Sequence, residues 1–277
     1  KMANQKFQIL LTNDDGIQSP GLWAGAEALS ELGYVTVAAP REQSSGTGRS
    51  IPVTSDGKIY PEKLTVHGKE WTVYAVNGTP AQAVLHGILE ITPTPPELSV
   101  SGIDYGENIG SGITACGTVG AALEGAGNGI PSIAISLQTP MGLYLTYSRE
   151  VDFTIAGHFL KLFAKMMLEH SLPEDVDLLN INIPADATTQ TPWAITRLSR
   201  HRYFEVLRPN RASWDEPTMV SYDVLQDAST LPEDTDVYTM RVKRQVSVTP
   251  LSMDMTARVN LDDLNRDLHN HHTPESE

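Results

Sequence analysis

Two adjacent aspartates, Asp14 and Asp15, follow an apolar stretch and directly precede Gly16 in the segment ILLTNDDGIQSPG (9–21). Adjacent carboxylates repel each other, and neither aspartate nor glycine favours the interior of a strand. Consecutive side chains in an extended strand point to opposite faces, so the pair can share an ion only where the chain turns, which Gly16 permits. An ordinary turn or a helix N-cap would also explain Asp-Asp-Gly.

Further oxygen donors follow two other apolar stretches. Ser45 lies in the Ser/Gly-rich segment REQSSGTGRS (41–50), and Asp104 lies in SGIDYGENIG (101–110). With the two aspartates they form a set of hard oxygen ligands, which suits Mg²⁺, Mn²⁺ or Ca²⁺ better than zinc. The glycines from Gly110 to Gly117 lead into a helix whose first N–H groups can face a phosphate. This chemistry is that of metal-assisted hydrolysis of a phosphate monoester.

These donors need elements that bring them together. Short apolar stretches typical of buried strands alternate with amphipathic stretches typical of helices. The predicted strands are 7–12, 34–40, 98–102, 131–137 and 176–184, and the predicted helices include 20–32 and 149–170. This alternation predicts an α/β fold, a Rossmann-like, mostly parallel sheet with helices on both faces. Because ligands bind at the carboxyl ends of such strands, the polar loops should converge there.

Two parts of the chain depart from this alternation. A β-hairpin insertion is predicted at about 57–78, inside a Rossmann-like core of residues 1–195. Residues 196–277 are predicted to be a β-rich extension, with strands in VYTMRVKRQVSVTPL (237–251), followed by a polar C-terminal tail. Strands there need pairing partners, so this extension is expected to belong to the same domain and to a subunit interface, as an oligomerisation section.

Composition narrows the possible partners. The chain has 277 residues and a formal net charge of −14, which argues against a nucleic-acid polymer or an anionic membrane as partner. Its single cysteine, Cys116, excludes an intrachain disulfide and any multi-cysteine metal site. No stretch has the length and hydropathy of a membrane span or a signal peptide. These observations favour a cytoplasmic location and a small-molecule substrate.

Six blocks of the chain resemble the SurE family, the survival-protein E nucleotidases. They are ILLTNDDGIQSPGL, VAAPREQSSGTG, VNGTPAQAV, VSGIDYGENIG, GTVGAALEG and VSVTPLSMDMTA, in the order of that family, and the match runs from about residue 7 to 257. The resemblance implies a divalent-metal-dependent 5′-nucleotidase, or acid-phosphatase-like phosphomonoesterase. Its substrates would be nucleoside 5′- and 3′-monophosphates and, in some members, short polyphosphate. It also implies one Mg²⁺ or Mn²⁺ per subunit and a homo-oligomer, either dimer or tetramer.

The same resemblance assigns roles to individual residues. Asp14 and Asp15 match the paired metal ligands, Ser45 matches a serine ligand, and Asp104 stands where the family usually has asparagine. With the two aspartates, Asn108 is expected to act in catalysis. The expected phosphate-binding residues are Gly46, Asn108, Cys116, Gly117 and Thr118, with Cys116 replacing a serine. Asp104 adds a negative charge beside the ion, and a thiol is a weaker hydrogen-bond donor than a hydroxyl.

Two other functions compete with this interpretation. A phosphatase that forms an aspartyl-phosphate, like the haloacid dehalogenase-like enzymes, uses Asp-x-Asp after its first strand. The aspartates here are adjacent, which argues against that mechanism. A non-catalytic nucleotide-binding or sensor protein on the same fold is the second alternative, because a fold does not fix a function. The changes at Asp104 and Cys116 give this alternative its basis.

Overall fold

The structure is a computed structural model that describes residues 6–66, 68–140, 142–143 and 147–270. Within these ranges, nine strands form one sheet in the order β3-β4-β2-β1-β5-β6-β7-β11-β8. The central strands are β1 (Phe7–Thr12), β2 (Gly33–Pro40), β5 (Leu98–Tyr105), β6 (Ser132–Leu137) and β7 (Leu178–Ile183). They pair in parallel from β2 through β7. The predicted mostly parallel α/β sheet is therefore confirmed.

Both edges of the sheet contain antiparallel pairs. One edge is the predicted hairpin, β3 (Ile59–Val66) with β4 (Lys69–Val76), and β4 continues the sheet in parallel to β2. At the other edge β11 (Val246–Leu251) runs antiparallel to β7 and parallel to β8 (Trp193–Ile195). Strand β11 places part of the C-terminal section, residues 196–277, inside the central sheet.

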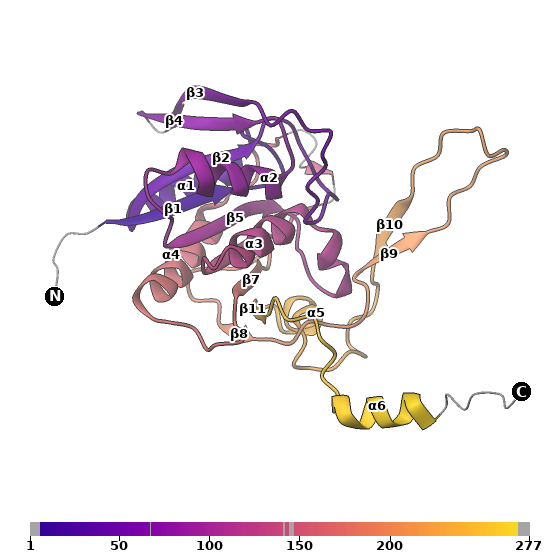
Figure 1. The fold of residues 1–277 in the computed structure, drawn as a ribbon. Helices are drawn as coiled ribbons and strands as arrows, with labels where there is room; N and C mark the ends of the chain where they lie inside the picture. The colour runs from indigo at the N-terminus through magenta and orange to yellow at the C-terminus, as the bar shows by residue number, and fades with distance from the viewer. Residues whose placement is uncertain (1–5, 67, 141, 144–146, 271–277) are drawn as a thin grey trace, which may run out of the picture.

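Helices cover both faces of the sheet (Figure 1). Ile9 and Leu11 of β1 pack in one apolar cluster with side chains of α1 (Pro20–Ser30) and α4 (Thr154–Glu169). Leu10, between them in the sequence, packs on the opposite face with α2 (Pro80–His86) and α3 (Gly117–Gly127). This alternation is the two-residue period of a strand that is buried on both faces. A single turn of π-helix, Gly87–Ile91, extends α2, and a 3-10 turn, Ser111–Ala115, precedes α3.

The C-terminal section differs from the prediction in two places. Residues 237–243, predicted as strand, are helical within α5 (Asp236–Tyr238) and a π-helical turn (Thr239–Lys243). Thr235 caps this helix by accepting a hydrogen bond from the Tyr238 N–H, 3.4 Å away, and Val237 and Met240 are buried three residues apart, on one helical face. Their β-branched and aromatic neighbours made the segment resemble a strand, but tertiary packing overrode that propensity.

The polar tail also contains an element that the sequence did not predict. Residues Leu261–Asn270 form helix α6, which extends from the body of the molecule and has no buried residue. Its leucines Leu261, Leu264 and Leu268 recur at helical spacing. Residues 271–277 lie outside the described part of the chain.

A second extension is the antiparallel hairpin of β9 (Phe204–Leu207) and β10 (Ser221–Val224), drawn in orange in Figure 1. It projects away from the sheet and its helices. In the described residues, no helix combines the length and the hydropathy needed to cross a membrane.

Candidate metal centre

The two aspartates lie in a tight turn directly after β1. The Asn13 side chain closes this turn, because its Oδ1 accepts from the Gly16 N–H at 3.1 Å and its Nδ2 donates to the Gly16 carbonyl at 3.2 Å. Gly16 has a φ of +102°, which a residue with a Cβ would rarely adopt. The chain therefore bends where the sequence predicted, and both carboxylates lie at the carboxyl end of β1.

Asp14 contacts the beginning of α3. Its Oδ1 accepts a hydrogen bond from the Thr118 hydroxyl at 2.5 Å. A Cβ on Gly117 would lie only 2.6 Å from the Asp14 Cβ, so the approach of helix and loop requires glycine at this position. The first turn of α3 thus lies against the first carboxylate, and its N–H groups that lack intrahelical partners are close to the site.

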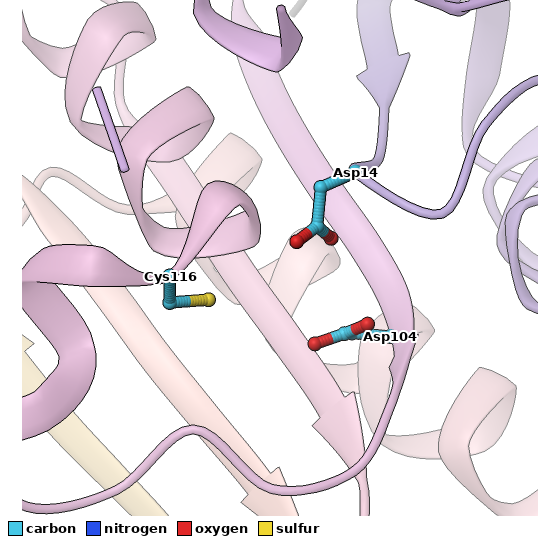
Figure 2. A group of neighbouring side chains, drawn as sticks. All are labelled: Asp14, Asp104 and Cys116. Atoms are coloured by element: carbon cyan, nitrogen blue, oxygen red, sulfur yellow. The ribbon is translucent and has the colours of Figure 1, made fainter. Parts of the chain in front are cut away.

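Asp104 lies at the carboxyl end of β5, the strand next to β1. Figure 2 shows the Asp14 and Asp104 carboxylates facing a common space, with the Cys116 thiol reaching toward it from the start of α3. One potential ligand atom from each of these three residues lies within 4.8 Å of the other two. Side chains that are 90 residues apart in the sequence, Asp14 and Asp104, are therefore brought together as predicted.

Asp15 is the most unusual side chain of the group. Its side chain has no exposed surface, and within the described structure neither carboxylate oxygen has a hydrogen-bond partner of good geometry, although the Ser19 side chain and the Tyr105 backbone lie near enough to lower its pKa. A buried carboxylate without a partner is costly, and proteins retain one mainly where a cation or a reaction needs it. The surroundings raise the pKa of Asp15 to about 8, first by burial and then by the negative charge of Asp14.

The neighbouring acids, Asp14 and Asp104, are also buried close to like charges. Burial raises the pKa of Asp14 despite the hydrogen bond from Thr118. Burial, followed by the charges of Asp14 and Asp15, raises the pKa of Asp104 well above its usual value. The pKa of the Cys116 thiol is raised by burial and by the charges of Asp14 and Asp104, so the sulfur stays protonated and is a poor nucleophile.

Cys116 also has a structural role at this position. It is the N-cap of α3, and its sulfur accepts a hydrogen bond from the Val119 N–H at 3.4 Å. A serine hydroxyl caps helices in the same way, with a stronger acceptor. The cysteine therefore occupies the position of a helix-capping hydroxyl beside Asp14 and Asp104.

Asn108 is held firmly beside Asp104. Its side-chain amide donates to Asp104 Oδ2 at 2.6 Å and to the Ser136 hydroxyl at 2.9 Å. Its backbone N–H donates to Asn182 Oδ1 at 2.7 Å, and its carbonyl accepts from Asn180 and Asn182. Ser136, Asn180 and Asn182 are supporting residues that sequence reasoning missed. The two asparagines that interrupt the apolar strand LLNINI (178–183) were the available signal.

Ser45 and Gly46 lie on the loop after β2, which contacts the site through its backbone. The Ser44 N–H donates to the Asp14 carbonyl at 2.7 Å. Ser45 itself is exposed, and its hydroxyl accepts a hydrogen bond from Gln43 at 3.1 Å. In the described part of the chain no hydrogen bond joins Ser45 to a carboxylate, so the structure connects this loop to the site only through its backbone.

The donor set fits a hard divalent cation. The carboxylates of Asp14 and Asp104 lie together with the Cys116 thiol, and the buried Asp15 carboxylate lies close enough to both acids to interact with their charge. Carboxylate oxygens are the ligands that Mg²⁺ and Mn²⁺ prefer. A cation would remove the like-charge repulsion that raises the pKa values of these acids. The chemistry of these acids therefore fits a Mg²⁺ or Mn²⁺ site.

Comparison with known proteins agrees with this description. A family model described as "Survival protein SurE" matches residues 9–205. A "5′-nucleotidase SurE" of Thermococcus gammatolerans is 43% identical, over 93% of this chain and 94% of its own length. Another protein of that name, from Methanocella arvoryzae, is 41% identical over 91% of this chain and 94% of its own length.

A solved structure gives the same fold. The crystal structure of the SurE protein from Aquifex aeolicus superposes with a TM-score of 0.73 at 31% identity, covering 95% of this chain and 99% of that one. The family model matches most of the chain, and the relatives are about 40% identical over nearly its full length. This chain belongs to the SurE family.

Proposed function

We propose that this chain is a divalent-metal-dependent nucleotidase that hydrolyses the phosphate monoester of nucleoside 5′-monophosphates. The observation that carries the proposal is the buried Asp15 carboxylate, which has no hydrogen-bond partner of good geometry and lies beside Asp14 and Asp104. The family membership and the relatives named 5′-nucleotidase SurE support the choice of substrate.

The acids Asp14, Asp15 and Asp104 would hold the ion, one Mg²⁺ or Mn²⁺ per subunit, with Ser45 as a further ligand. When bound, such an ion neutralises phosphoryl oxygens and lowers the pKa of a coordinated water. Asp14 is already oriented by its hydrogen bond from Thr118, and Asp104 by its hydrogen bond from Asn108. The paired aspartates would then also orient or deprotonate the attacking water.

The phosphate would be bound at the beginning of α3. The N–H groups of Gly117 and Thr118 belong to the first helical turn and lack intrahelical acceptors. They now face the Asp14 carboxylate and lower its pKa, so a bound phosphate would share them with Asp14. Gly46, on the exposed loop after β2, would approach the phosphate from the other side. Asn108 and Cys116 complete the proposed phosphate-binding group, Asn108 through its amide and Cys116 through its position as helix cap.

Several finer features belong to the same proposal. They are activity on nucleoside 3′-monophosphates and short polyphosphate, a cytoplasmic location, and assembly into a dimer or tetramer. The division of the chain at about residue 195 into a catalytic core and an oligomerising section also belongs here. The exposed apolar side chains of the β9–β10 hairpin support assembly, since an unpaired apolar hairpin is costly in water.

Phosphate release from a substrate panel tests the proposed function. The panel contains nucleoside 5′- and 3′-monophosphates and tripolyphosphate, each with Mn²⁺, with Mg²⁺ and with a chelator. We expect rapid release from 5′-monophosphates with either metal and none with the chelator. Full activity in chelator, or no release from any substrate with either metal, would reject the proposed function.

A nucleotide sensor is the second candidate, because Asp104 adds a third carboxylate where a phosphate dianion has to approach. Calorimetry with a nucleoside monophosphate and Mn²⁺ distinguishes the two functions. A sensor would bind the nucleotide tightly and release no phosphate during hours of incubation.

A further inference from the structure

One buried acid beside the metal centre has no part in the proposed chemistry. Glu107 directly precedes Asn108, and its side chain is only 5% exposed. Its Oε1 accepts hydrogen bonds from the Tyr203 hydroxyl and from Gln138 Nε2, the second at 3.0 Å. Unlike Asp15, this carboxylate has well-formed hydrogen bonds, both to Oε1, and its partners lie outside the metal centre.

Tyr203 connects this acid to the C-terminal section. Its hydroxyl accepts a hydrogen bond from Arg241 Nη1 at 2.7 Å, and the Arg241 guanidinium lies 5.5 Å from the centre of the Tyr203 ring. The ring is buried in an apolar cluster with Ile109, Val237 and Met240. Burial and the charge of Glu107 raise the pKa of Tyr203, so the phenol keeps its proton and donates a hydrogen bond to Glu107.

Glu107 and Asn108 belong to the segment 106–110, and hydrogen bonds hold this segment on two sides. On the side of the sheet, the Gly106 N–H donates to the Leu137 carbonyl at 2.8 Å, and the Asn108 N–H donates to Asn182. On the side of the C-terminal section, the Gly110 N–H donates to Asp236 Oδ2 at 2.8 Å. Between these two sets of backbone hydrogen bonds, the buried Glu107 side chain contacts Tyr203 of the C-terminal section.

We infer that Glu107 is a positioning residue, through which Tyr203 and Arg241 of the C-terminal section hold the segment that orients Asp104 and Asn108. This inference rests on the proposed function for its effect on catalysis. Asn108 donates directly to Asp104, so any movement of the 106–110 segment changes the position of a proposed metal ligand. Displacement of a catalytic group by about 1 Å can reduce a rate about 100-fold.

The substitution Tyr203→Phe removes only the hydroxyl that joins Glu107 to Arg241 and keeps the buried ring. The matched control is Tyr34→Phe, at an exposed tyrosine near the amino end of β2. We expect amide hydrogen exchange in peptides covering 104–112 to become about tenfold faster in Tyr203→Phe and to stay unchanged in the control. We expect kcat on a nucleoside 5′-monophosphate at saturating Mn²⁺ to fall about 30-fold, with KM within about twofold.

Substitution of Glu107 separates positioning from chemistry. Glu107→Gln keeps an oxygen that accepts from Tyr203 and Gln138, so it should retain kcat within about threefold, whereas Glu107→Ala should lose as much as Tyr203→Phe. Equal losses in the two Glu107 variants would assign chemistry to the carboxylate and overturn the positioning role.

The exchange measurement tests the positioning of the segment without reference to activity, and kcat tests its effect on catalysis. Unchanged exchange at 104–112 in Tyr203→Phe would overturn it, and so would faster exchange with unchanged kcat. If the wild-type protein released no phosphate, the proposed function would fail. Faster exchange in Tyr203→Phe, with the control unchanged, would still support the positioning of the segment in that case.

Discussion

The metal centre and the β9–β10 hairpin place their side chains in opposite ways. In the metal centre, charged groups such as Asp14, Asp15 and Asp104 are buried. In the hairpin, large apolar groups are exposed, including Trp214 at 93% and Met219 at 88%. Each arrangement is costly in an isolated chain, the first because of like charges and the second because of apolar surface in water. The comparison shows two regions with opposite costs, and it is consistent with the proposals of a cation at the first and a subunit contact at the second.

The largest effect should follow from loss of the unpartnered carboxylate. Asp15→Asn removes an anionic ligand while keeping the shape of the side chain, and kcat with Mn²⁺ should fall about 1000-fold or more. Asp262→Asn, at an exposed aspartate of α6, is the matched control and should leave kcat unchanged. Phosphate release at saturating Mn²⁺ measures both. Metal-dependent turnover in Asp15→Asn equal to that of the control would remove Asp15 from the site.

Asp104→Asn should have a smaller and more specific effect. It removes one negative charge beside the ion, so Mn²⁺ affinity should fall about tenfold, while turnover at saturating metal stays level or rises. The amide oxygen can still accept the hydrogen bond from Asn108. Titration of activity against Mn²⁺ measures both the metal affinity and the turnover at saturating metal. A loss of about 100-fold at saturating metal would instead make Asp104 the base that activates water.

The repulsion among the acids should be visible in the stability of the metal-free protein. The folded chain keeps a proton on Asp15 until its pKa of about 8, whereas the unfolded chain releases it near 3.8. The stabilisation linked to this proton is therefore present at low pH and is lost as the pH rises toward about 8. We expect the metal-free Tm to fall by several degrees over this range, and to recover at the upper end when Mn²⁺ is added.

Asp15→Asn is the control for this pH dependence, because an amide does not titrate. Without metal, its Tm at about pH 8 should exceed that of the wild-type protein, and Mn²⁺ should raise it little. Identical Tm profiles for the two proteins would show that burial of Asp15 contributes nothing to the pH dependence.

The smallest effect on catalysis should come from the hairpin. Replacing residues 208–220 by an Asn-Gly turn would join Leu207 to Ser221, which already face each other in the β9–β10 pair. We expect light scattering to show a smaller assembly than that of the wild-type protein. Turnover per chain should stay within about twofold, because the acids proposed for the metal centre lie outside residues 208–220. An unchanged mass would exclude the hairpin as the main subunit contact.

The sequence predicted those features that depend on local patterns. Alternating apolar stretches predicted the parallel sheet, and the convergence of strand ends predicted that Asp14 and Asp104 would meet. It could not predict helix 236–243, because burial of Val237 and Met240 depends on a cluster formed with Ile109 and Tyr203. The hydrogen bond between Glu107 and Tyr203 joins residues 96 positions apart, so local sequence patterns could not predict it either. Such contacts exist only once the C-terminal section packs against the core.

The most direct test of the metal centre is the binding of Mn²⁺ itself, followed by electron paramagnetic resonance at increasing metal concentration. The wild-type chain should bind one Mn²⁺ per subunit, and Asp15→Asn should bind it about 100-fold more weakly. Asp262→Asn should bind like the wild-type protein. If Asp15→Asn and the wild-type protein gave the same binding curve, the buried carboxylate would not be a metal ligand and the proposed centre would be wrong.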